Sequence, residues 1–374
     1  MSAPHLLHVF SNFVPTGPEL RTVELIGAFG CDFRHSIVSM DGRTGAAERL
    51  PPDAGVRLLP SPPKAGSLAT ARRLRRLLQE ERPDLVLTYN WGAFDMLLAA
   101  RSAGFRRLIH HEEGFNADEA EQFKRRRVWA RRLVLPGAAA LVVPSESLRS
   151  LAAGLWRLPP ERIRLIPNGI RLDRFAPSPG AGNPELRARL GIPREALVVG
   201  TAGSLRPVKN HLRLLEAVAA AGRDIHILLV GDGQERPVLE SRASAPDLAG
   251  RVCFAGYQEM PAPFYQAMDI FALTSNSEQM PVALLEAMAS GLPVVSTDVG
   301  DVRAMLPPEQ ARFVVPPDPA AAEGLAGRIA ELARSPDLRW QLGALNRKRV
   351  EERYSAAAMC AAYREVYEST LAVR

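Results

Sequence analysis

Residues 275–291, SNSEQMPVALLEAMASG, combine a loop with the start of a helix and carry two glutamates, Glu278 and Glu286. Pro281 suits the first helical position, because the N–H group that proline lacks would have no partner there. Good helix formers follow, and Gly291 ends the helix. This pattern places Glu278 in the loop before the helix and Glu286 about one and a half turns inside it.

The start of this helix is also a candidate anion site. The unpaired amides of Met280, Val282 and Ala283 are expected to point out of the helix start, where a phosphate group fits. An ionised carboxylate only accepts hydrogen bonds, so Glu278 and Glu286 suit the neighbouring hydroxyls of a ribose or a hexose. The segment therefore fits a sugar nucleotide. On spacing alone, a solvated helix start with two incidental glutamates remains the alternative.

The composition is that of a globular protein, with 374 residues, 47% hydrophobic and 24% charged. This length predicts two domains, or one large one. The three cysteines, Cys31, Cys253 and Cys360, are far apart and odd in number, so neither a disulfide framework nor a zinc-ligand spacing is present. The first residues lack the features of a signal peptide, and no apolar run has the length of a membrane span. We expect a cytoplasmic protein.

Positive charge is concentrated in the first half of the chain. Residues 1–178 contain 26 Lys and Arg against 18 Asp and Glu, whereas residues 179–374 contain 21 against 23. Basic clusters lie at residues 72–76, 106–107 and 124–132. Such an excess of positive charge favours binding to an acidic membrane surface, to phosphorylated substrates or to nucleic acid. An Arg-rich composition explains the preference for Arg over Lys, but it does not explain the asymmetry.

Strand-like and helix-like segments alternate, which predicts parallel sheets with helices on both faces. The expected strands are residues 6–10, 35–40, 56–59, 85–88, 107–111, 140–143, 162–166, 197–202, 225–230, 252–255, 270–273, 294–297 and 313–315. The expected helices are 19–29, 67–81, 93–102, 210–221, 234–244, 321–333, 338–354 and 356–371, and further helices are expected between the last four strands. Residues 176–185, rich in Pro, Gly and Ser, are interpreted as a linker. We therefore expect an α/β protein of two Rossmann-like doubly wound domains, 1–178 and 179–355, facing a central cleft. Ligands should bind at the carboxyl ends of the strands.

The loop after the strand at 197–202 carries a second group of candidate residues. It reads GSLRPVKN from Gly203, and it places Arg206 and Lys209 at the same strand-end edge as Glu278. An Arg fork and a Lys charge can hold a diphosphate and stabilise it as it leaves. Two ordinary surface cations beside a helix cap are the alternative. The turn at 231–233, GDG, lacks the full dinucleotide-binding pattern and is interpreted as structural.

Together these segments resemble the donor-binding domain of the retaining GT-B glycosyltransferases, specifically glycosyltransferase family 4. The resemblance is strong over about residues 160–305 and weak over the first half. The motifs occur in one order: I-P-N-G-I-R from Ile166, G-x-L-R-x-x-K from Gly203, L-V-G-D-G from Leu229, V-x-F-x-G from Val252, E-x7-E from Glu278, L-E-A-M-A-S-G-L-P-V-V from Leu285 and T-D-V-G-D from Thr297. Each motif alone is moderately specific, but the ordered set is highly specific.

The resemblance implies a role for each matched residue. Arg206 and Lys209 would bind the donor diphosphate, Glu286 the ribose hydroxyls and Glu278 the donor sugar. Tyr257 would lie near the base, and Gly203, Met280 and Val282 would line the donor. The sugar would be transferred with retention of configuration, without a metal or other cofactor, and the departing diphosphate would help to activate the acceptor. The C-terminal residues 356–374 would pack back on the first domain.

The first half departs from the family pattern at two places. The glycine-rich first loop has a single glycine, Gly17, in the run V-P-T-G-P-E. Relatives place a histidine in an E-H-G-like run, whereas this chain reads H-H-E-E-G at residues 110–114. The catalytic position is therefore either Glu113 or His111. A third departure is Asp301, which replaces the second glycine of the usual G-G.

The leading hypothesis is a hexosyltransferase that moves a hexose or N-acetylhexosamine from a UDP- or GDP-sugar to a lipid-linked or polysaccharide acceptor in cell-surface glycan synthesis. The basic first domain would lie on the anionic inner face of the cell membrane. A nucleotide-sugar epimerase or a phosphorylase on the same fold is the alternative, against which the Arg–Lys and Glu–Glu pairs argue. A nucleic-acid partner is not expected, because no basic stripe with interleaved aromatics occurs.

Overall fold

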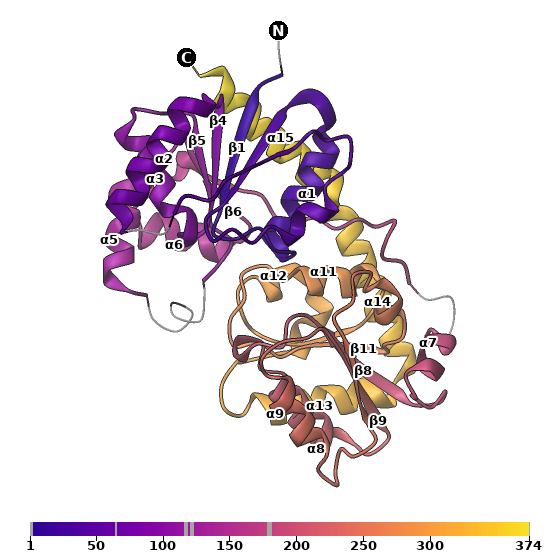
Figure 1. Ribbon diagram of the computed structural model, residues 1–374. Helices are drawn as coiled ribbons and strands as arrows, with labels where there is room; N and C mark the ends of the chain where they lie inside the picture. Colours follow the sequence, from indigo (N-terminus) through magenta and orange to yellow (C-terminus); the bar gives the residue numbers. More distant parts are fainter. Residues whose placement is uncertain (1–2, 64–65, 116–118, 120–122, 178–181, 374) are drawn as a thin grey trace. The chain divides into compact units, whose positions relative to one another are not determined.

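The computed structural model describes residues 3–63, 66–115, 119, 123–177 and 182–373. The chain divides into two compact units, Met1–Pro167 with Ala358–Arg374, and Asn168–Ala357 (Figure 1). The first unit thus ends before residue 178, because Asn168 and Ile170 already bond to the second unit. The Asn168 side-chain amide donates to the carbonyl of Met280 at 2.9 Å, and Ile170 N donates to the carbonyl of Tyr354 at 2.8 Å.

The first unit is built on a seven-stranded parallel sheet with the order β3-β2-β1-β4-β5-β6-β7. Its strands are β1 His5–Phe10, β2 Arg34–Ser39, β3 Arg57–Leu59, β4 Leu85–Tyr89, β5 Leu108–His111, β6 Ala140–Val143 and β7 Ile163–Leu165. The strand order changes direction between β1 and β4, so the loops that follow these two strands lie at a topological switch point. The central strands β1 and β4 are buried along their whole length and consist mostly of hydrophobic residues, as expected for a sheet buried on both faces.

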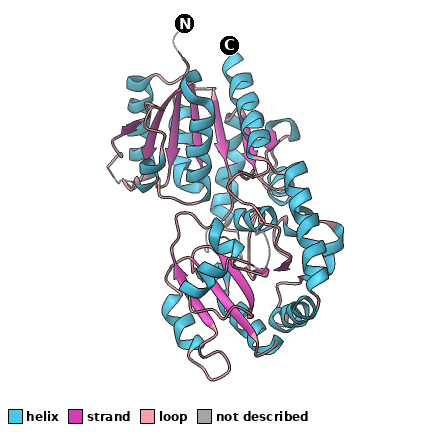
Figure 2. Ribbon diagram, turned by 90° about the vertical axis from the view of Figure 1, so that its right-hand side faces the viewer, coloured by secondary structure: helices cyan, strands magenta, loops and turns pink. Residues whose placement is uncertain are grey.

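Helices cover both faces of this sheet (Figure 2). One face packs against α2 Ser67–Glu81, α3 Phe94–Ser102, α5 Arg125–Val134 and α6 Glu146–Gly154. The other packs against α1 Gly17–Phe29 and the C-terminal helix α15 Ala356–Ala372. From α15, Met359, Tyr363 and Tyr367 recur at helical spacing and are buried in this core. From Ala358 onward the C-terminal segment therefore belongs to the first unit.

The second unit is built on a six-stranded parallel sheet with the order β10-β9-β8-β11-β12-β13. Its strands are β8 Leu197–Ala202, β9 Ile225–Val230, β10 Val252–Gly256, β11 Ile270–Leu273, β12 Val294–Thr297 and β13 Val314–Val315. Its helices are α7 Pro184–Arg189, α8 His211–Ala221, α9 Arg236–Ala243, α10 Ala262–Gln266, α11 Val282–Ala289, α12 Val302–Met305, α13 Ala321–Arg334 and α14 Pro336–Arg353. The order changes direction between β8 and β11, and this switch point positions the loops considered next.

The expected pair of doubly wound sheets is therefore confirmed in both halves. Within the described residues, the helices α5, α6 and α7 were not foreseen, and α7 begins at Pro184 inside the expected linker. Residues 178–181 of that linker lie outside the described residues. Among the helices in the described part of the chain, none is both long enough and apolar enough to span a bilayer.

Candidate functional site

Two loops of the second unit leave neighbouring strands at the switch point and are bonded to each other. One follows β8 and the other follows β11. The Thr274 hydroxyl donates to the carbonyl of Asn210 at 3.0 Å, and Asn276 N donates to the carbonyl of Val208 at 2.8 Å. The Arg213 guanidinium donates to the carbonyl of Thr274 at 2.9 Å. The two loops thus form one platform at the carboxyl edge of the sheet.

Lys209 and Glu278, one from each loop, meet on this platform. The Lys209 ammonium donates to Glu278 Oε1 at 2.5 Å, and the Ser275 hydroxyl donates to the same oxygen at 2.7 Å. Both contacts use Oε1, so Glu278 Oε2 has no hydrogen-bond partner among the described residues. Arg206 lies on the first loop with an exposed side chain, and its Nε donates to the Ser204 hydroxyl at 2.9 Å. The structure therefore brings Lys209 and Glu278 into contact, whereas the guanidinium group of Arg206 is exposed to solvent.

Two other turns, around Gly231 and Gly300, pack closely against the backbone of the platform and hold it in place. A Cβ atom on Gly231 would lie 1.9 Å from the carbonyl oxygen of Gly203, and one on Gly300 would lie 2.5 Å from that of Glu278. Both glycines also have positive φ, 135° and 55°. The turn around Gly231 therefore supports the Arg206–Lys209 loop, and the loop around Gly300 supports Glu278. Gly203 itself has φ 146° and open space where a Cβ would stand.

Helix α11 begins at Val282, one residue later than expected, with Pro281 in extended conformation before it. Val282 is partly exposed in the first turn, whereas Met280 is buried and its carbonyl accepts the Asn168 amide. Glu286 lies one turn further along the helix. Its Oε2 accepts a hydrogen bond from the Tyr265 hydroxyl at 2.6 Å. Burial raises the pKa of Glu286 to about 7, although the Tyr265 hydroxyl opposes this by stabilising the carboxylate.

Tyr257 follows β10, two strands away from β8 in the sheet order, and 57% of its surface is exposed. The backbone before it is anchored, since Gly231 N donates to the carbonyl of Gly256 at 2.8 Å. Tyr257 is therefore on the same strand-end edge as Lys209 and Glu278, but at its periphery. An exposed aromatic ring in this position can stack on a planar base.

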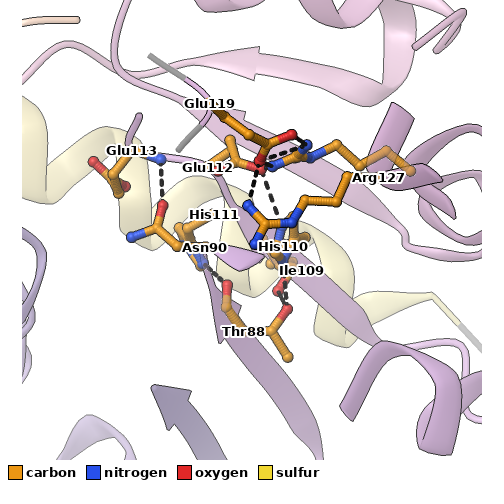
Figure 3. Close-up of polar contacts among 10 residues, drawn as sticks. Thr88, Asn90, Ile109, His110, His111, Glu112, Glu113, Glu119 and Arg127 are labelled. Atoms are coloured by element: carbon orange, nitrogen blue, oxygen red, sulfur yellow. Dashed lines mark hydrogen bonds and ion pairs between the residues drawn. The ribbon is translucent and has the colours of Figure 1, made fainter. Parts of the chain in front are cut away.

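In the first unit, His111 is the last residue of β5, labelled in Figure 3. It is completely buried. Its Nδ1 lies 3.2 Å from the carbonyl of Thr88, its Nε2 lies 3.4 Å from the Tyr367 hydroxyl, and its ring stacks on Tyr89 at 4.5 Å. Burial lowers the pKa of His111 well below its usual value, which keeps the imidazole neutral. Of the two alternatives for the catalytic position, His111 is thus the one that is enclosed by neighbouring side chains.

Glu113 lies two residues further, at the carboxyl edge of the first sheet. Its backbone N–H donates to Asn90 Oδ1 at 2.8 Å, a contact drawn in Figure 3. Its carboxylate forms a two-point pair with Arg21 of α1, in which Nη1 donates to Oε2 at 2.7 Å and Nη2 donates to Oε1. The Arg21 guanidinium in turn lies over the ring of Tyr363, 5.4 Å from its centre. Glu113 is thus a carboxylate fixed by an arginine, whereas the family pattern has a histidine in this run.

Gly17 is the first residue of α1 and is exposed, with nothing within 4 Å of an added Cβ. The loop containing Gly17 follows β1, one of the two strands at the switch point of the first sheet. The first turn of α1 carries Glu19, whose carboxylate accepts a hydrogen bond from the Thr16 hydroxyl. An acidic first turn is unfavourable for an anion, so this helix start differs from that of α11.

Comparison with known proteins identifies the family. The family "Glycosyl transferases group 1" matches residues 182–349, and "Glycosyl transferase 4-like domain" matches residues 16–169. The chain is 30% identical to EpsF of Bacillus subtilis over 72% of this chain and 68% of that protein. It is also 30% identical to GDP-mannose-dependent alpha-mannosyltransferase of Mycobacterium tuberculosis, over 72% and 71%. The chain belongs to the glycosyl transferases group 1 family.

Solved structures give the same fold for this glycosyltransferase. The UDP complex of Alr3699/HepE from Anabaena superimposes with a TM-score of 0.82 at 20% identity, covering 98% of this chain and 100% of that one. The expected GT-B architecture is therefore confirmed. Among the curated relatives, the matched stretches cover between 50% and 71% of the relatives' own lengths. At the level of the family, the enzyme is a glycosyltransferase.

One buried group in this glycosyltransferase was not foreseen from the sequence. Arg131 of α5 is 1% exposed, and its guanidinium contacts Glu112 and Glu119 at 3.2 Å each. It also lies within 4.9–5.6 Å of the ring centres of Trp91, Phe115 and Trp156. The basic segment 124–132 therefore does not face solvent as a whole. Charge counting cannot separate a buried arginine from an exposed one, and the aromatic rings that enclose Arg131 come from distant segments.

Proposed function

We propose that this glycosyltransferase transfers a hexose or N-acetylhexosamine from a nucleotide sugar, UDP- or GDP-linked, to a lipid-linked or polysaccharide acceptor, with retention of configuration. The observation that carries the proposal is the contact between Lys209 and Glu278 at the switch point of the second sheet. A cation and a carboxylate side by side fit a ligand that joins a diphosphate to a polyhydroxyl group. Relatives named for GDP-mannose and UDP-galactose support this class of donor.

In the proposed complex, the Lys209 ammonium is shared between Glu278 and the donor diphosphate. The ammonium has three donors, and Glu278 uses one of them. The exposed guanidinium of Arg206 binds the same diphosphate, and Glu278 Oε2 accepts a hydroxyl of the donor sugar. The bond between sugar and diphosphate breaks, and the bond to the acceptor oxygen forms on the same face. The acceptor proton passes to the departing diphosphate, whose charge Arg206 and Lys209 stabilise.

The remaining candidate residues take supporting roles in this proposal. Tyr257 lies against the base, Glu286 accepts the ribose hydroxyls, and the amide of Val282 faces the diphosphate. Glu113 and the loop at Gly17 lie at the carboxyl edge of the first sheet and serve the acceptor side. Because Arg206 and Lys209 supply the positive charge, we expect no requirement for a metal or other cofactor.

The donor site is tested by calorimetric titration with UDP-glucose, GDP-mannose and ADP-glucose. For the nucleotide sugar that binds, Lys209→Ala and Arg206→Ala should each weaken affinity by about 10–100-fold, because charge-assisted contacts to the diphosphate are lost. Lys348→Ala is the matched control, since Lys348 is an exposed lysine on α14 of the same unit. Unchanged affinity in both site variants would refute the donor site.

Product analysis distinguishes the proposed transfer from other reactions on this fold. With nucleotide sugar alone, an epimerase would change the sugar, and with added phosphate a phosphorylase would form a sugar phosphate. The proposed transferase yields neither and consumes the donor only when an acceptor is supplied, apart from slow hydrolysis. Retention is checked by the anomeric configuration of the product, read from its NMR coupling constants.

The acceptor side of the proposal includes contact with an anionic membrane. On α5, Trp129 is 60% exposed and Leu133 is 64% exposed, and Arg125 and Arg126 are exposed on the same helix. Helix α2 adds an exposed Leu68 and four exposed arginines at positions 72, 73, 75 and 76. Apolar side chains next to arginines suit the boundary between acidic headgroups and acyl chains. The E. coli relative named for a diphosphoundecaprenol acceptor acts on a lipid-linked substrate, which fits this placement.

Sedimentation with vesicles tests the membrane contact. The protein should bind vesicles that contain phosphatidylglycerol, with affinity that falls as salt rises, and should not bind neutral vesicles. Trp129→Ser with Leu133→Ser should reduce binding about tenfold or more, since two exposed apolar anchors are removed. Trp340→Ser, on α14 of the second unit and 76% exposed, is the control. Equal loss in the control would assign the binding to general surface hydrophobicity.

A further inference from the structure

Tyr265 is a buried tyrosine whose hydroxyl reaches the donor-side carboxylate of Glu286. It lies on the short helix α10 and is 0% exposed. Its ring packs against Phe271 and Phe175, with ring centres 5.8 Å apart in both pairs. Rings of this size packed on two sides leave little freedom for the hydroxyl. The position of the Tyr265 oxygen is therefore set by the core of the second unit.

The Tyr265 hydroxyl has one proton and two acceptors within reach. Glu286 Oε2 lies at 2.6 Å, whereas the backbone carbonyl of Ala283 lies at 3.3 Å. The shorter contact is typical of a hydroxyl that donates to a carboxylate. Since this contact uses Oε2, Glu286 Oε1 has no hydrogen-bond partner among the described residues, and it is not sealed from solvent.

A tyrosine that needed only a hydrogen-bond partner would not require a carboxylate there. The carbonyl of Ala283 or a neutral glutamine would satisfy the hydroxyl without the cost of removing a charge from water. No cation is paired with Glu286 among the described residues. On the elements around α11, Arg347 of α14 bonds the carbonyls of Ala289 and Phe175, and Lys209 is paired with Glu278. An uncompensated carboxylate in a partly buried place is more typical of a binding site than of a structural contact.

We propose that Tyr265 is a positioning residue, whose hydroxyl fixes Oε2 of Glu286 and thereby leaves Oε1 to accept the neighbouring hydroxyls of the donor's ribose. The inference rests on the proposed function, because it assumes that Glu286 contacts the ribose. It goes further by assigning a role to a residue that has no contact with the donor. It also makes donor binding depend on pH in the neutral range.

The pH dependence follows from the two influences on Glu286. Burial raises the pKa of Glu286 to about 7, and the Tyr265 hydroxyl lowers it by stabilising the ionised form. In the wild-type protein, donor affinity should rise as pH increases through about 7, because the carboxylate accepts two hydroxyls better than the protonated acid does. Tyr265→Phe removes the stabilising hydroxyl, so the midpoint should move upward by about one pH unit. At pH 7 the variant should bind about fivefold more weakly, because the ionised fraction of Glu286 would fall from about one half to about one tenth.

The experiment is a calorimetric titration of the full chain with UDP-glucose and GDP-mannose between pH 5.5 and pH 8.5. Tyr354→Phe is the matched control, because it removes another tyrosine hydroxyl from the same unit. A 2′-deoxyribose analogue of the nucleotide sugar that binds provides a second readout. The wild-type protein should prefer the ribose form, and Tyr265→Phe should narrow that preference. In a Glu286→Gln background, Tyr265→Phe should have no further effect on the preference.

Two outcomes separate this inference from the proposed function. If the wild-type protein binds neither nucleotide sugar, the donor site itself fails and the inference fails with it. If the wild-type protein binds and Tyr265→Phe keeps both the wild-type midpoint and the ribose preference, the positioning role alone is rejected, whatever happens to thermal stability. Carbon-13 NMR of the Glu286 carboxyl in the ligand-free protein adds a readout independent of the donor. Its titration midpoint should lie higher in Tyr265→Phe than in the wild type.

Discussion

At the scale of single residues, the site consists of side chains whose neighbours decide what they can do. Glu278 and Glu286 belong to the same short segment, yet one contacts a lysine and the other a buried tyrosine. The first is an ion pair at a loop edge, and the second is an unpaired acid whose pKa is raised to about 7 by burial. Spacing in the sequence could not separate these two environments, because both partners come from other segments.

Glu113 and Arg21 allow a prediction at this scale. Their side chains are 8% and 7% exposed and form a two-point pair. Replacing one partner, as in Arg21→Met or Glu113→Gln, should lower the free energy of unfolding by about 3–5 kcal/mol, because a buried charge is left without its counter-charge. The double variant Arg21→Met with Glu113→Gln should lose clearly less than the sum of the two single losses. Urea unfolding measures all three, and strictly additive losses would contradict a coupled pair.

At the scale of elements, the conformation of the loops after β8 and β11 depends on two glycines in neighbouring turns, Gly231 and Gly300, which pack against the backbone of these loops. The turn after β9 contacts the loop after β8 so closely that only a hydrogen fits at Gly231. The GDG turn thus contributes to the candidate site through its backbone contacts. Its interpretation as a structural turn agrees with these contacts.

The variant Gly231→Ala tests whether this glycine supports the loop after β8. The new Cβ would lie 1.9 Å from the carbonyl oxygen of Gly203, so the loop with Arg206 and Lys209 must move. Donor affinity should fall by about tenfold or more, and the variant should also be destabilised, since φ is 135°. Gly327→Ala is the control, because Gly327 lies in α13 with open space around it. That change should stabilise the second unit by about 0.5–1 kcal/mol.

At the scale of the whole molecule, the first unit contains several histidines buried in neutral form. Burial lowers the pKa of His35 to about 4 and the pKa values of His8 and His111 well below their usual range. The unfolded chain has ordinary histidines, so it binds more protons than the folded one below about pH 6.5. The stability from these residues is complete above that pH and is lost as pH falls toward the folded-state pKa values.

We therefore predict that the first unit loses stability between about pH 7 and pH 5, by on the order of 2 kcal/mol for His35 alone. In the second unit, Glu286 acts in the opposite sense, because its pKa is raised in the folded state. Trp91, Trp129 and Trp156 lie in the first unit and Trp340 in the second, so Trp340→Phe makes fluorescence report the first unit. Thermal melts should shift downward on acidification. A midpoint that stays constant from pH 7.5 to pH 5.5 would refute the prediction.

The order of strands and helices follows from the amino-acid pattern alone. Short apolar runs such as 197–202 and 270–273 coincide with β8 and β11, because a strand buried on both faces needs uninterrupted hydrophobic residues. Helix α5 was not foreseen, since five of its ten residues are arginines and only Val128, Arg131 and Val134 of the helix are buried. Its helical character depends on packing rather than on a regular apolar stripe.

The local pattern also determined the motifs of the proposed donor site, from Gly203 to Lys209 and from Glu278 to Glu286, because each lies within one loop or one helix start. The tertiary structure decided which residues share an environment. It joined Lys209 to Glu278, enclosed His111 between Tyr89 and Tyr367, and brought Tyr265 to Glu286. Each of these contacts joins segments that are distant along the chain, so only the packing of the sheets and helices could fix burial, ionisation and hydrogen-bond partners.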